Sequence, residues 1–431
     1  MRVALIGPAH PYKGGGARHT TELARWLAAA GHDVVIESWS RQYPAGLYPG
    51  GQQTVDVPEG EPFPHTLRRL SWRRPAGWFA AGRRLRDMDL VAFALLIPPQ
   101  AIPYLAILTG LAGLRAVRRD REPGGPAGPA GPAGPAGSSR VRVRRPRTVV
   151  ICHNVAPHES RPGDQLLTRW LLRRAGTVLT HSAAEAARAR ALAPGAQVTA
   201  VRMPPHLPAA APAPGPGPGD HAAAGHDQAE YSPIHRSAPC RLLFFGIVRP
   251  YKGLDVLLRA LARVSPEVTL TVAGEFWGRA EEETRVLIDR LGLTGRVTLR
   301  PGYVSADEIP VLFAASDALV LPYRSATSSQ NAWLAFAHGV PVVVTRAGTL
   351  ADAVRDGVDG VVCEPDDEDD LVRALERVSA PGEVARLRSA VRAADPEDYW
   401  APYLEALLSL AASPTPEPPG LEPPGLEPMA R

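Results

Sequence analysis

Cysteine is scarce in this 431-residue chain, and its spacing suggests neither a disulfide framework nor a metal site. The three cysteines, Cys152, Cys240 and Cys363, are scattered without a CxxC pair, which argues against zinc and suits a reducing compartment. No cluster of carboxylates offers a site for a divalent metal. The net charge of +4 fits an anionic ligand or an anionic membrane surface, and we expect no nucleic acid partner.

A long uninterrupted apolar run is also missing. Residues 90–114 carry no charge, and about 20 apolar residues can span a bilayer, but Pro98, Pro99 and Pro103 interrupt the stretch. It therefore predicts a buried strand, a proline loop and a helix. The first residues hold too short an apolar run for a signal peptide, so we expect a cytoplasmic protein. The arginines after residue 114 also allow peripheral contact with the inner face of the membrane.

Short apolar, β-branched runs alternate with helical patterns through both halves of the chain. Runs that are apolar on both faces are typical of parallel strands covered by helices. The alternation predicts an α/β protein with two doubly wound, Rossmann-like domains that face a cleft. The expected strands lie within residues 2–7, 32–38, 89–97, 147–154 and 176–182, and within 241–246, 268–275, 296–302, 317–323 and 340–345.

Segments rich in proline, glycine and alanine interrupt this alternation and set the expected domain boundaries. Such compositions cannot bury enough apolar surface to fold, so they predict linkers and disordered segments. We expect an N-terminal domain over 1–204 with a disordered insertion at about 122–139, a linker over 205–239, a C-terminal domain over 240–395, a terminal helix over 396–412 and a disordered tail over 413–431.

The tetrapeptide PYKG occurs twice, at 11–14 and at 250–253, each time between an expected strand and an expected helix. Ligands of doubly wound domains bind beyond the carboxyl ends of strands, at the loops that lead into helices. Two such domains that face each other would therefore place one PYKG loop on each wall of the cleft.

The first of these loops continues into Gly14, Gly15 and Gly16, which let the backbone approach a ligand closely. The helix that follows would point its free amides at the cleft. The loop has neither the phosphate-loop motif nor GxGxxG, because His19 stands where the last glycine belongs, and an ordinary tight turn is an equal alternative. We expect Lys13 to be an exposed cation with a small contribution.

The second loop carries two cations, Arg249 and Lys252, directly after an expected strand. Two cations beside a helix start suit a diphosphate, although a solvated basic turn has the same composition. Further along, Thr327, Ser328 and Ser329 precede a helix and could hold phosphate oxygens, although helix capping uses the same residues.

His153 lies at the end of an expected central strand. A histidine there can donate a hydrogen bond to a sugar hydroxyl or to a leaving oxygen. A histidine at the edge of the core is an equal alternative.

Several stretches, taken in order, resemble the family 4 (group 1) glycosyltransferases of the GT-B fold. They include GGGARHTTELARWLAAAGHDVVI, HNVAPHE, FFGIVRPYKGLDVLLRAL, LTVAGEFWG, VTLRPGYVSADEIPVLFAASDALVLPY and GVPVVVTRAGTL. The resemblance covers most of the chain outside the low-complexity segments. It implies a retaining transfer of a sugar from a nucleotide-sugar donor to a glycan, a glycolipid or another cell-envelope acceptor, with no metal and no cofactor.

The resemblance also implies roles for the domains and for single residues. The N-terminal domain would be the acceptor side and the C-terminal domain would bind the nucleotide sugar. Arg249 and Lys252 would neutralise the departing diphosphate, and His153 would reach the donor sugar. The implied donor-binding residues are Gly14, Gly15, Gly16, Gly274, Glu275, Tyr303, Val304, Thr327, Ser328 and Ser329.

One departure from the family pattern leaves alternatives open. The family usually carries two glutamates eight positions apart, and Ala326 and Leu334 stand in their places. Their loss favours a non-catalytic scaffold or binding module that keeps the fold. A sugar-nucleotide epimerase is a further alternative on a similar scaffold, but no paired acid and base can be assigned to it.

Overall fold

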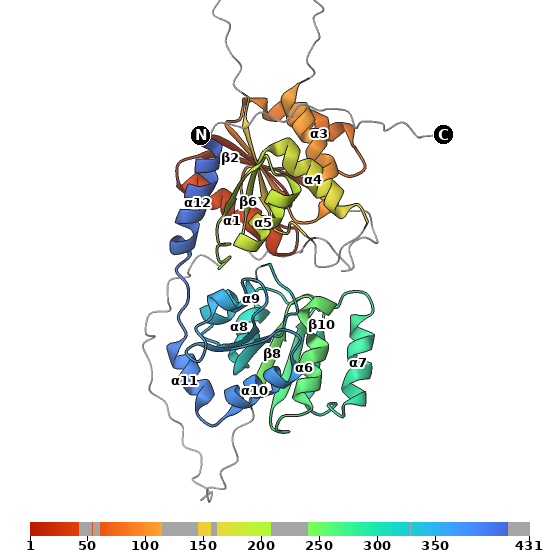
Figure 1. The fold of residues 1–431 in the computed structure, drawn as a ribbon, viewed down its shortest axis with the longest axis vertical. Coiled ribbons are helices and arrows are strands. Elements are labelled where there is room, and N and C mark those ends of the chain that lie inside the picture. The colour runs from red at the N-terminus through yellow and green to blue at the C-terminus, as the bar shows by residue number, and fades with distance from the viewer. Residues whose placement is uncertain are drawn as a thin grey trace, which may run out of the picture.

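The computed structural model describes residues 1–42, 54, 61–113, 145–156, 162–207, 240–327 and 329–412. They form two α/β domains placed end to end, and the last helix returns to the N-terminal domain (Figure 1). The expected insertion at 122–139, most of the expected linker and the expected tail lie outside the described residues.

The N-terminal domain is built on a sheet of seven parallel strands in the order β3-β2-β1-β4-β5-β6-β7. Its central strands are covered on both faces; in β4, for example, every residue is buried. The strands are β1 (Arg2–Ile6), β2 (Asp33–Arg41), β3 (Thr66–Ser71), β4 (Leu90–Leu95), β5 (Arg147–Cys152), β6 (Thr177–Thr180) and β7 (Gln197–Ala200). The helices are α1 (Gly15–Ala29), α2 (Ala76–Arg84), α3 (Ala101–Ala112), α4 (Asp164–Ala175) and α5 (Ala183–Leu192).

The C-terminal domain repeats the plan with six parallel strands in the order β10-β9-β8-β11-β12-β13. The strands are β8 (Arg241–Phe245), β9 (Thr269–Gly274), β10 (Val297–Pro301), β11 (Ala318–Leu321), β12 (Val342–Thr345) and β13 (Gly360–Cys363). The helices are α6 (Leu254–Leu261), α7 (Ala280–Arg290), α8 (Glu308–Ala314), α9 (Asn331–Ala337), α10 (Glu368–Ser379) and α11 (Glu383–Ala390).

The predicted fold class, two doubly wound α/β domains, is confirmed. The uncharged stretch 90–114 contains strand β4, a turn at Pro98–Gln100 and helix α3, as its prolines predict. Among the described residues, no helix combines the length and the apolar character that crossing a bilayer requires. Three strands were not expected, β3, β7 and β13, and all three lie at sheet edges, where strands are short or polar.

The order of strands fixes where each domain can bind a ligand. In the first sheet the chain runs outward from β1 to β3, then returns to pair β4 with the other side of β1. In the second sheet β11 pairs with β8 in the same way. The loops after β1 and β8 therefore leave the sheets at the two points where a crevice opens beyond the carboxyl ends of the strands.

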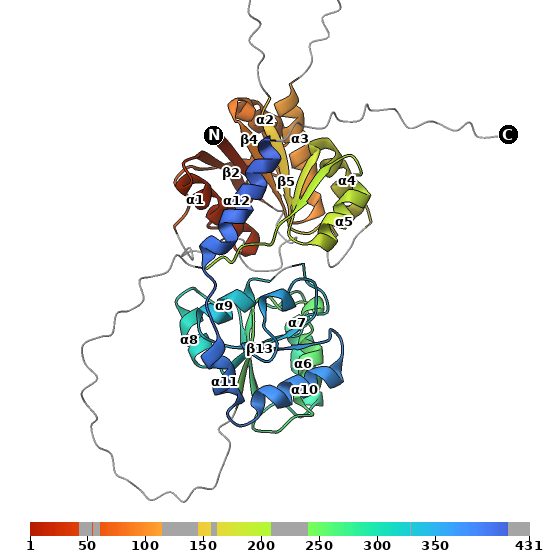
Figure 2. The same ribbon diagram turned by 60° about the vertical axis from the view of Figure 1, so that its left-hand side comes forward.

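The terminal helix α12 (Pro396–Ala412) crosses from the C-terminal domain and packs on the N-terminal one (Figure 2). It buries Trp400, Tyr403 and Leu407 in the core that contains β1 and β5. The chain crosses in the other direction at residues 201–207, where His206 is also buried. Residues 205–207, the start of the expected linker, are thus packed between the domains.

Both crossings meet a cluster of buried histidines. His19 of α1 contacts His206 through ring nitrogens 2.9 Å apart and contacts the Tyr403 hydroxyl at 2.9 Å. The His153 ring lies 4.9 Å from those of His19 and His181. We name His19, His153, His181 and His206 the histidine cluster.

Burial keeps the histidine cluster neutral. It lowers the pKa of His153 to about 4, and burial together with neighbouring imidazoles lowers the pKa values of His19 and His181 well below 6.5. Burial, the charge on Arg18 and neighbouring imidazoles do the same to the pKa of His206. Below pH 6.5 the unfolded chain binds protons that the folded protein excludes. The free energy of unfolding must therefore decrease as the pH falls.

We expect the free energy of unfolding to drop by at least about 2 kcal/mol from about pH 7 to about pH 5, the share that His153 alone would contribute. Urea titrations across this range measure it. His181→Asn should flatten the pH dependence because it removes one excluded proton, and His65→Gln, at an exposed position, should leave it unchanged. Equal slopes in all three proteins would show that the cluster does not control acid stability.

Candidate active site

A cavity of about 270 Å³ lies between the domains, where the loops after β1 and β8 face each other. The N-terminal domain and the crossing segment line it with His10, Tyr12, Lys13, Gly14, Gly15, Arg18 and His206. The C-terminal domain lines it with Phe245, Gly246, Ile247, Lys252, Gly274, Glu275, Gly302, Tyr303, Val304, Ile309, Gln330, Asn331 and Leu334.

The three glycines of the first loop have three different reasons to be glycine. Gly14 has φ +96°, a conformation that other residues rarely adopt. A Cβ at Gly15 would meet no atom within 4 Å, so this position opens directly into the cavity. A Cβ at Gly16 would lie 2.4 Å from the Leu96 side chain, so Gly16 permits close packing and does not line the cavity.

Lys13 bridges the two domains across the cavity. Its Nζ lies 3.1 Å from Glu275 Oε1 and 4.4 Å from the centre of the Tyr303 ring. The Lys13 and Glu275 side chains are only 10% and 18% exposed. The expectation that Lys13 is an exposed cation is therefore wrong, and the reason is that residues of the other domain cover it.

Lys252 occupies the opposite wall and is buried, with 9% of its surface exposed. Burial, with a contribution from the charge on Arg249, lowers the pKa of Lys252. Its Nζ has no hydrogen-bond or ion-pair partner among the described residues, and the nearest ring, that of Tyr323, is 5.2 Å away. A buried cation that lines a cavity without a carboxylate partner is suited to an anionic ligand.

Arg249 does not line the cavity. Its guanidinium carbon lies 3.9 Å from the centre of the Trp277 ring, so the side chain stacks on an aromatic face beside the Lys252 turn. A role for Arg249 at the diphosphate stays a prediction.

The loop after β11 contributes differently from what the sequence suggests. Thr327 Oγ1 donates to Asn154 Oδ1 at 2.6 Å, so it joins the two domains and does not line the cavity. Ser329 Oγ accepts from the Asn331 backbone N–H at 3.3 Å, and Ser328 lies outside the described residues. Gln330 and Asn331 line the cavity in their place.

The other predicted donor-binding residues, Gly274, Glu275, Tyr303 and Val304, all line the cavity. Gly274 has φ +145°, and a Cβ there would lie 2.1 Å from the Gly246 carbonyl oxygen. The backbone just after β8 and the end of β9 therefore approach so closely that only glycine fits at position 274.

Two further positions bear on the family comparison. Leu334, at the place of a missing glutamate, lines the cavity near Phe245, Val304 and Ile309 and makes this side apolar. His153 is 6% exposed inside the histidine cluster and does not line the cavity; His10 and His206 form this wall. That His153 reaches a donor sugar stays a prediction.

Two family models match the chain. Glycosyltransferase Family 4 matches residues 13–117, and Glycosyl transferases group 1 matches residues 239–380. Each model falls on one domain and includes one lysine of the cavity. The chain belongs to the family 4, group 1 glycosyltransferases.

Curated relatives match this family 4 glycosyltransferase over part of its length. A D-inositol 3-phosphate glycosyltransferase from Mycobacterium sp. (strain KMS) is 34% identical over 151 residues, which is 34% of each chain. A protein of the same name from Xylanimonas cellulosilytica is 33% identical over 183 residues, 41% of this chain and 43% of the relative. The matches thus span less than half of these relatives.

Solved structures match nearly the whole fold. HepE from Anabaena, in complex with UDP and glucose, has a TM-score of 0.63 and 16% identity over 95% of this chain and 100% of its own. The catalytic domain of starch synthase IV from Arabidopsis thaliana, bound to ADP and acarbose, has a TM-score of 0.63 and 15% identity over 95% of this chain and 98% of its own. The likeness establishes the GT-B fold.

Sequence reasoning missed three features of the cavity in this family 4 glycosyltransferase. Arg18 lines it one helical turn after Gly14, a spacing that could have been read from the sequence. Asn331, whose Nδ2 donates to the Phe245 carbonyl at 2.8 Å, gives no such signal. The burial of Lys13 depends on its contact with Glu275, which is 262 residues away in the sequence and so cannot be read from the loop itself.

Gly15→Val should abolish nucleotide binding while the protein folds, because its side chain enters open cavity space without a backbone penalty. Gly195→Val is the matched control: it also meets no atom within 4 Å and also has no positive φ, but it lies before β7 and away from the cavity. Calorimetric titration with UDP, GDP, ADP and dTDP, with circular dichroism for folding, compares the two. Normal binding by Gly15→Val would place the ligand elsewhere.

Proposed function

We propose that this protein transfers a sugar from a nucleotide-sugar donor to a glycan or lipid-linked acceptor, with retention of configuration. The single observation that carries the proposal is the buried Lys252, which lines the interdomain cavity and has no carboxylate partner in the part of the chain that the structure describes. A nucleoside diphosphate would supply the missing negative charge. The complexes of HepE with UDP and of starch synthase IV with ADP support this class of ligand.

Composition adds an independent argument for both cavity lysines. The chain has 48 lysines and arginines, and only Lys13 and Lys252 are lysine. Every other basic position is arginine, yet both lysines line the cavity. Lysine offers a compact ammonium with rotatable donors, whereas the guanidinium is larger and planar. We infer that the cavity requires the smaller cation on each wall.

In the proposed reaction the diphosphate lies between Lys252 and the amides of Gly14 and Gly15 at the start of α1. As the bond from the sugar to the diphosphate breaks, negative charge develops on the departing oxygen, and Lys252 stabilises it. Lys13 can exchange its ion pair with Glu275 for one with the diphosphate, because a carboxylate oxygen of Glu275 and a phosphate oxygen would both lie within reach of the Lys13 ammonium. The apolar side at Val304 and Leu334 then receives the nucleoside or the sugar.

The test is incubation with a panel of UDP-, GDP-, ADP- and dTDP-sugars, with mass spectrometry of the products. Release of a nucleoside diphosphate with hydrolysis or transfer supports the proposal. An altered sugar still joined to its nucleotide would indicate an epimerase. Binding without turnover would indicate the non-catalytic scaffold that Ala326 and Leu334 allow.

Lys252→Ala should reduce kcat/KM by roughly 30- to 1000-fold, because loss of a charge-assisted contact to a buried anion costs about 2 to 4 kcal/mol. Lys13→Ala should also be damaging, since only 10% of the Lys13 side chain is exposed and it contacts Glu275 across the cavity. Lys252→Arg and Lys13→Arg keep the charge and test whether size matters. Wild-type rates in Lys252→Ala would disprove the diphosphate assignment.

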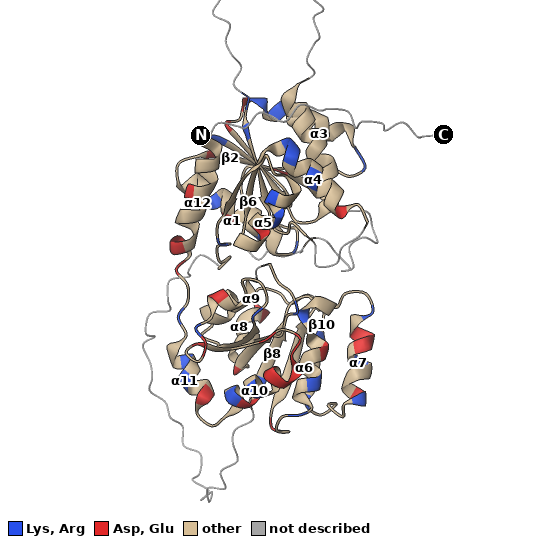
Figure 3. Cartoon of the chain, viewed as in Figure 1, with Lys and Arg blue, Asp and Glu red and all other residues tan. Residues whose placement is uncertain are grey.

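We also propose that helix α4 docks on an anionic membrane, where a lipid-linked acceptor would be found. Leu166, Arg169, Trp170 and Arg173 share one face at i, i+3, i+4 and i+7 spacing, and Trp170 is 52% exposed. Arg169, Arg173 and Arg174 have no acidic partner among the described residues, and Figure 3 shows basic segments along α4. Exposed aromatic and cationic groups on one helix face suit a lipid surface.

Replacement of Arg169, Arg173 and Arg174 by Gln should weaken binding to vesicles of phosphatidylcholine with phosphatidylglycerol by about 100-fold, at about 1 kcal/mol per arginine. The same change at Arg279, Arg285 and Arg290, on α7 or at its start, is the control and should have little effect. Sedimentation with vesicles measures both. If the two triple variants bind equally, α4 is not the membrane surface.

A further inference from the structure

The turn that carries Lys252 is held from outside by one residue, Arg324, in the loop after β11. Arg324 Nη1 donates to the Pro250 carbonyl oxygen at 2.7 Å. The backbone N–H of Arg324 donates to the Tyr251 carbonyl oxygen at 2.8 Å. Side chain and backbone of one arginine thus hold the two residues that directly precede Lys252.

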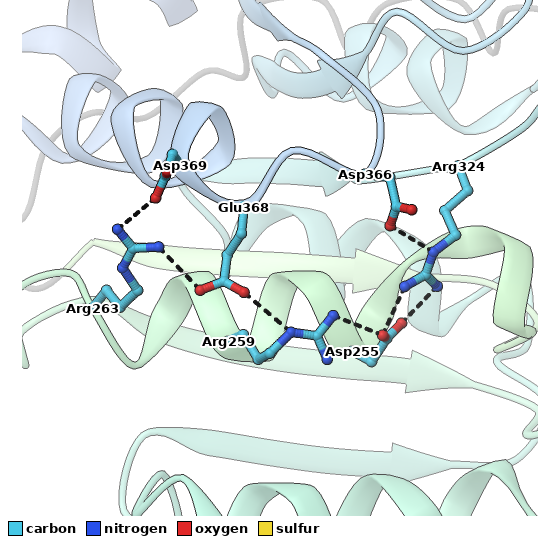
Figure 4. A network of polar contacts seen from close by, with 7 residues as sticks. All are labelled: Asp255, Arg259, Arg263, Arg324, Asp366, Glu368 and Asp369. Atoms are coloured by element: carbon cyan, nitrogen blue, oxygen red, sulfur yellow. Dashed lines mark hydrogen bonds and ion pairs between the residues drawn. The ribbon is translucent and has the colours of Figure 1, made fainter.

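The guanidinium is itself fixed by two carboxylates (Figure 4). Nη1 and Nη2 of Arg324 donate to the two oxygens of Asp255, in the first turn of α6, at 2.8 and 2.7 Å. Its Nε donates to Asp366 Oδ1 at 2.9 Å. This two-pronged pairing uses the planar geometry of arginine, which lysine cannot reproduce. Arg324 therefore joins the loops that follow β8, β11 and β13.

The backbones at this junction are packed tightly. A Cβ on Gly253 would lie 2.0 Å from the Pro322 carbonyl oxygen, so the Lys252 turn rests directly on the loop after β11. Asp366 has φ +59°, an uncommon conformation for a residue other than glycine, and points its carboxylate at Arg324. The turn at Gly253 and the loop at Asp366 therefore both have backbone conformations that the tight packing around Arg324 constrains.

We propose that Arg324 is a positioning residue of the donor site, which holds the turn 250–253 so that the Lys252 ammonium faces the cavity. Lysine has a flexible four-carbon stem, so its head group is placed only as well as its backbone is fixed. Arg324 does not line the cavity and acts through the turn. The proposal rests on the proposed function only for the identity of the ligand.

The network of ion pairs around Arg324 has a second end that can serve as a control. At its other end Arg263, two residues after α6, pairs with Glu368 and Asp369 at the start of α10, at 3.1 and 2.7 Å. Within the described part of the chain, Arg263, Glu368 and Asp369 make no hydrogen bond or ion pair with the Lys252 turn, and Arg259 lies between Glu368 and Asp255. An ordinary surface ion pair contributes little, so a network that served stability alone would respond similarly at both ends.

Arg324→Lys and Asp255→Asn separate positioning from charge. Arg324→Lys keeps the positive charge and loses the fork, so a purely electrostatic role predicts no change in affinity for UDP. Asp255→Asn makes the region more positive, so the electrostatic role predicts tighter binding. Positioning predicts the opposite for both variants: UDP binding weaker by about ten- to hundredfold, because small displacements of a binding group have effects of this size. Glu368→Gln, the matched control, should bind UDP like the wild type.

Hydrogen exchange reports on the turn without any ligand. The amides of Lys252 and Gly253 donate to Arg249 and Pro250 at 3.0 and 3.2 Å, so their protection measures how firmly the turn is held. We expect about tenfold faster exchange at these amides in Arg324→Lys and Asp255→Asn, and none of this acceleration in Glu368→Gln. Unchanged exchange, or tighter UDP binding by Asp255→Asn, would overturn the proposal. Faster exchange in a protein that binds none of UDP, GDP, ADP and dTDP would uphold the positioning and refute the proposed function.

Discussion

Parallel strands deliver the loops that follow them to one edge of the sheet, and the site depends on two such edges that face each other. In each sheet the change of chain direction, beside β1 and beside β8, leaves a gap between neighbouring connections. The two PYKG loops fill these gaps and bring one lysine to each wall. The tetrapeptide thus occurs twice because each domain has the same geometric requirement, a loop that carries a lysine from the first strand to the cavity.

Among the described residues, several polar contacts join the domains, and two of them involve residues that line the cavity on both sides. Lys13 meets Glu275, Asn154 meets Thr327, and Gln330 accepts from the backbone N–H of His206 at 2.7 Å. Both chain crossings lie beside His19, which contacts His206 and Tyr403 of α12, so any change in the angle between the domains would act on these contacts. A ligand that replaces Glu275 at Lys13 would therefore change a contact that also holds the domains together.

The sequence predicted what is local and missed what depends on the other domain. Central parallel strands are recognised by apolar residues on both faces, so they were found, whereas an edge strand such as β3 carries two exposed arginines. Lys252 and the glycine loop were located because position in a doubly wound domain is enough. The burial of Lys13 requires Glu275 and Tyr303, and the histidine cluster requires four separate segments. Contacts between segments so far apart in the sequence leave no local pattern from which they could be predicted.

The rarity of lysine has a practical chemical consequence. Apart from the N-terminal amine, the protein has only two primary amines, and both line the cavity. Reductive methylation is selective for amines, so once the N-terminal amine is subtracted, the mass gain of the intact protein counts the modified lysines of the site. Because the lowered pKa of Lys252 increases its unprotonated fraction, this amine has a nucleophile available at a lower pH than an ordinary lysine. An amine-reactive probe would therefore label side chains of the cleft selectively, and the extent of labelling would report whether the cleft is open or filled.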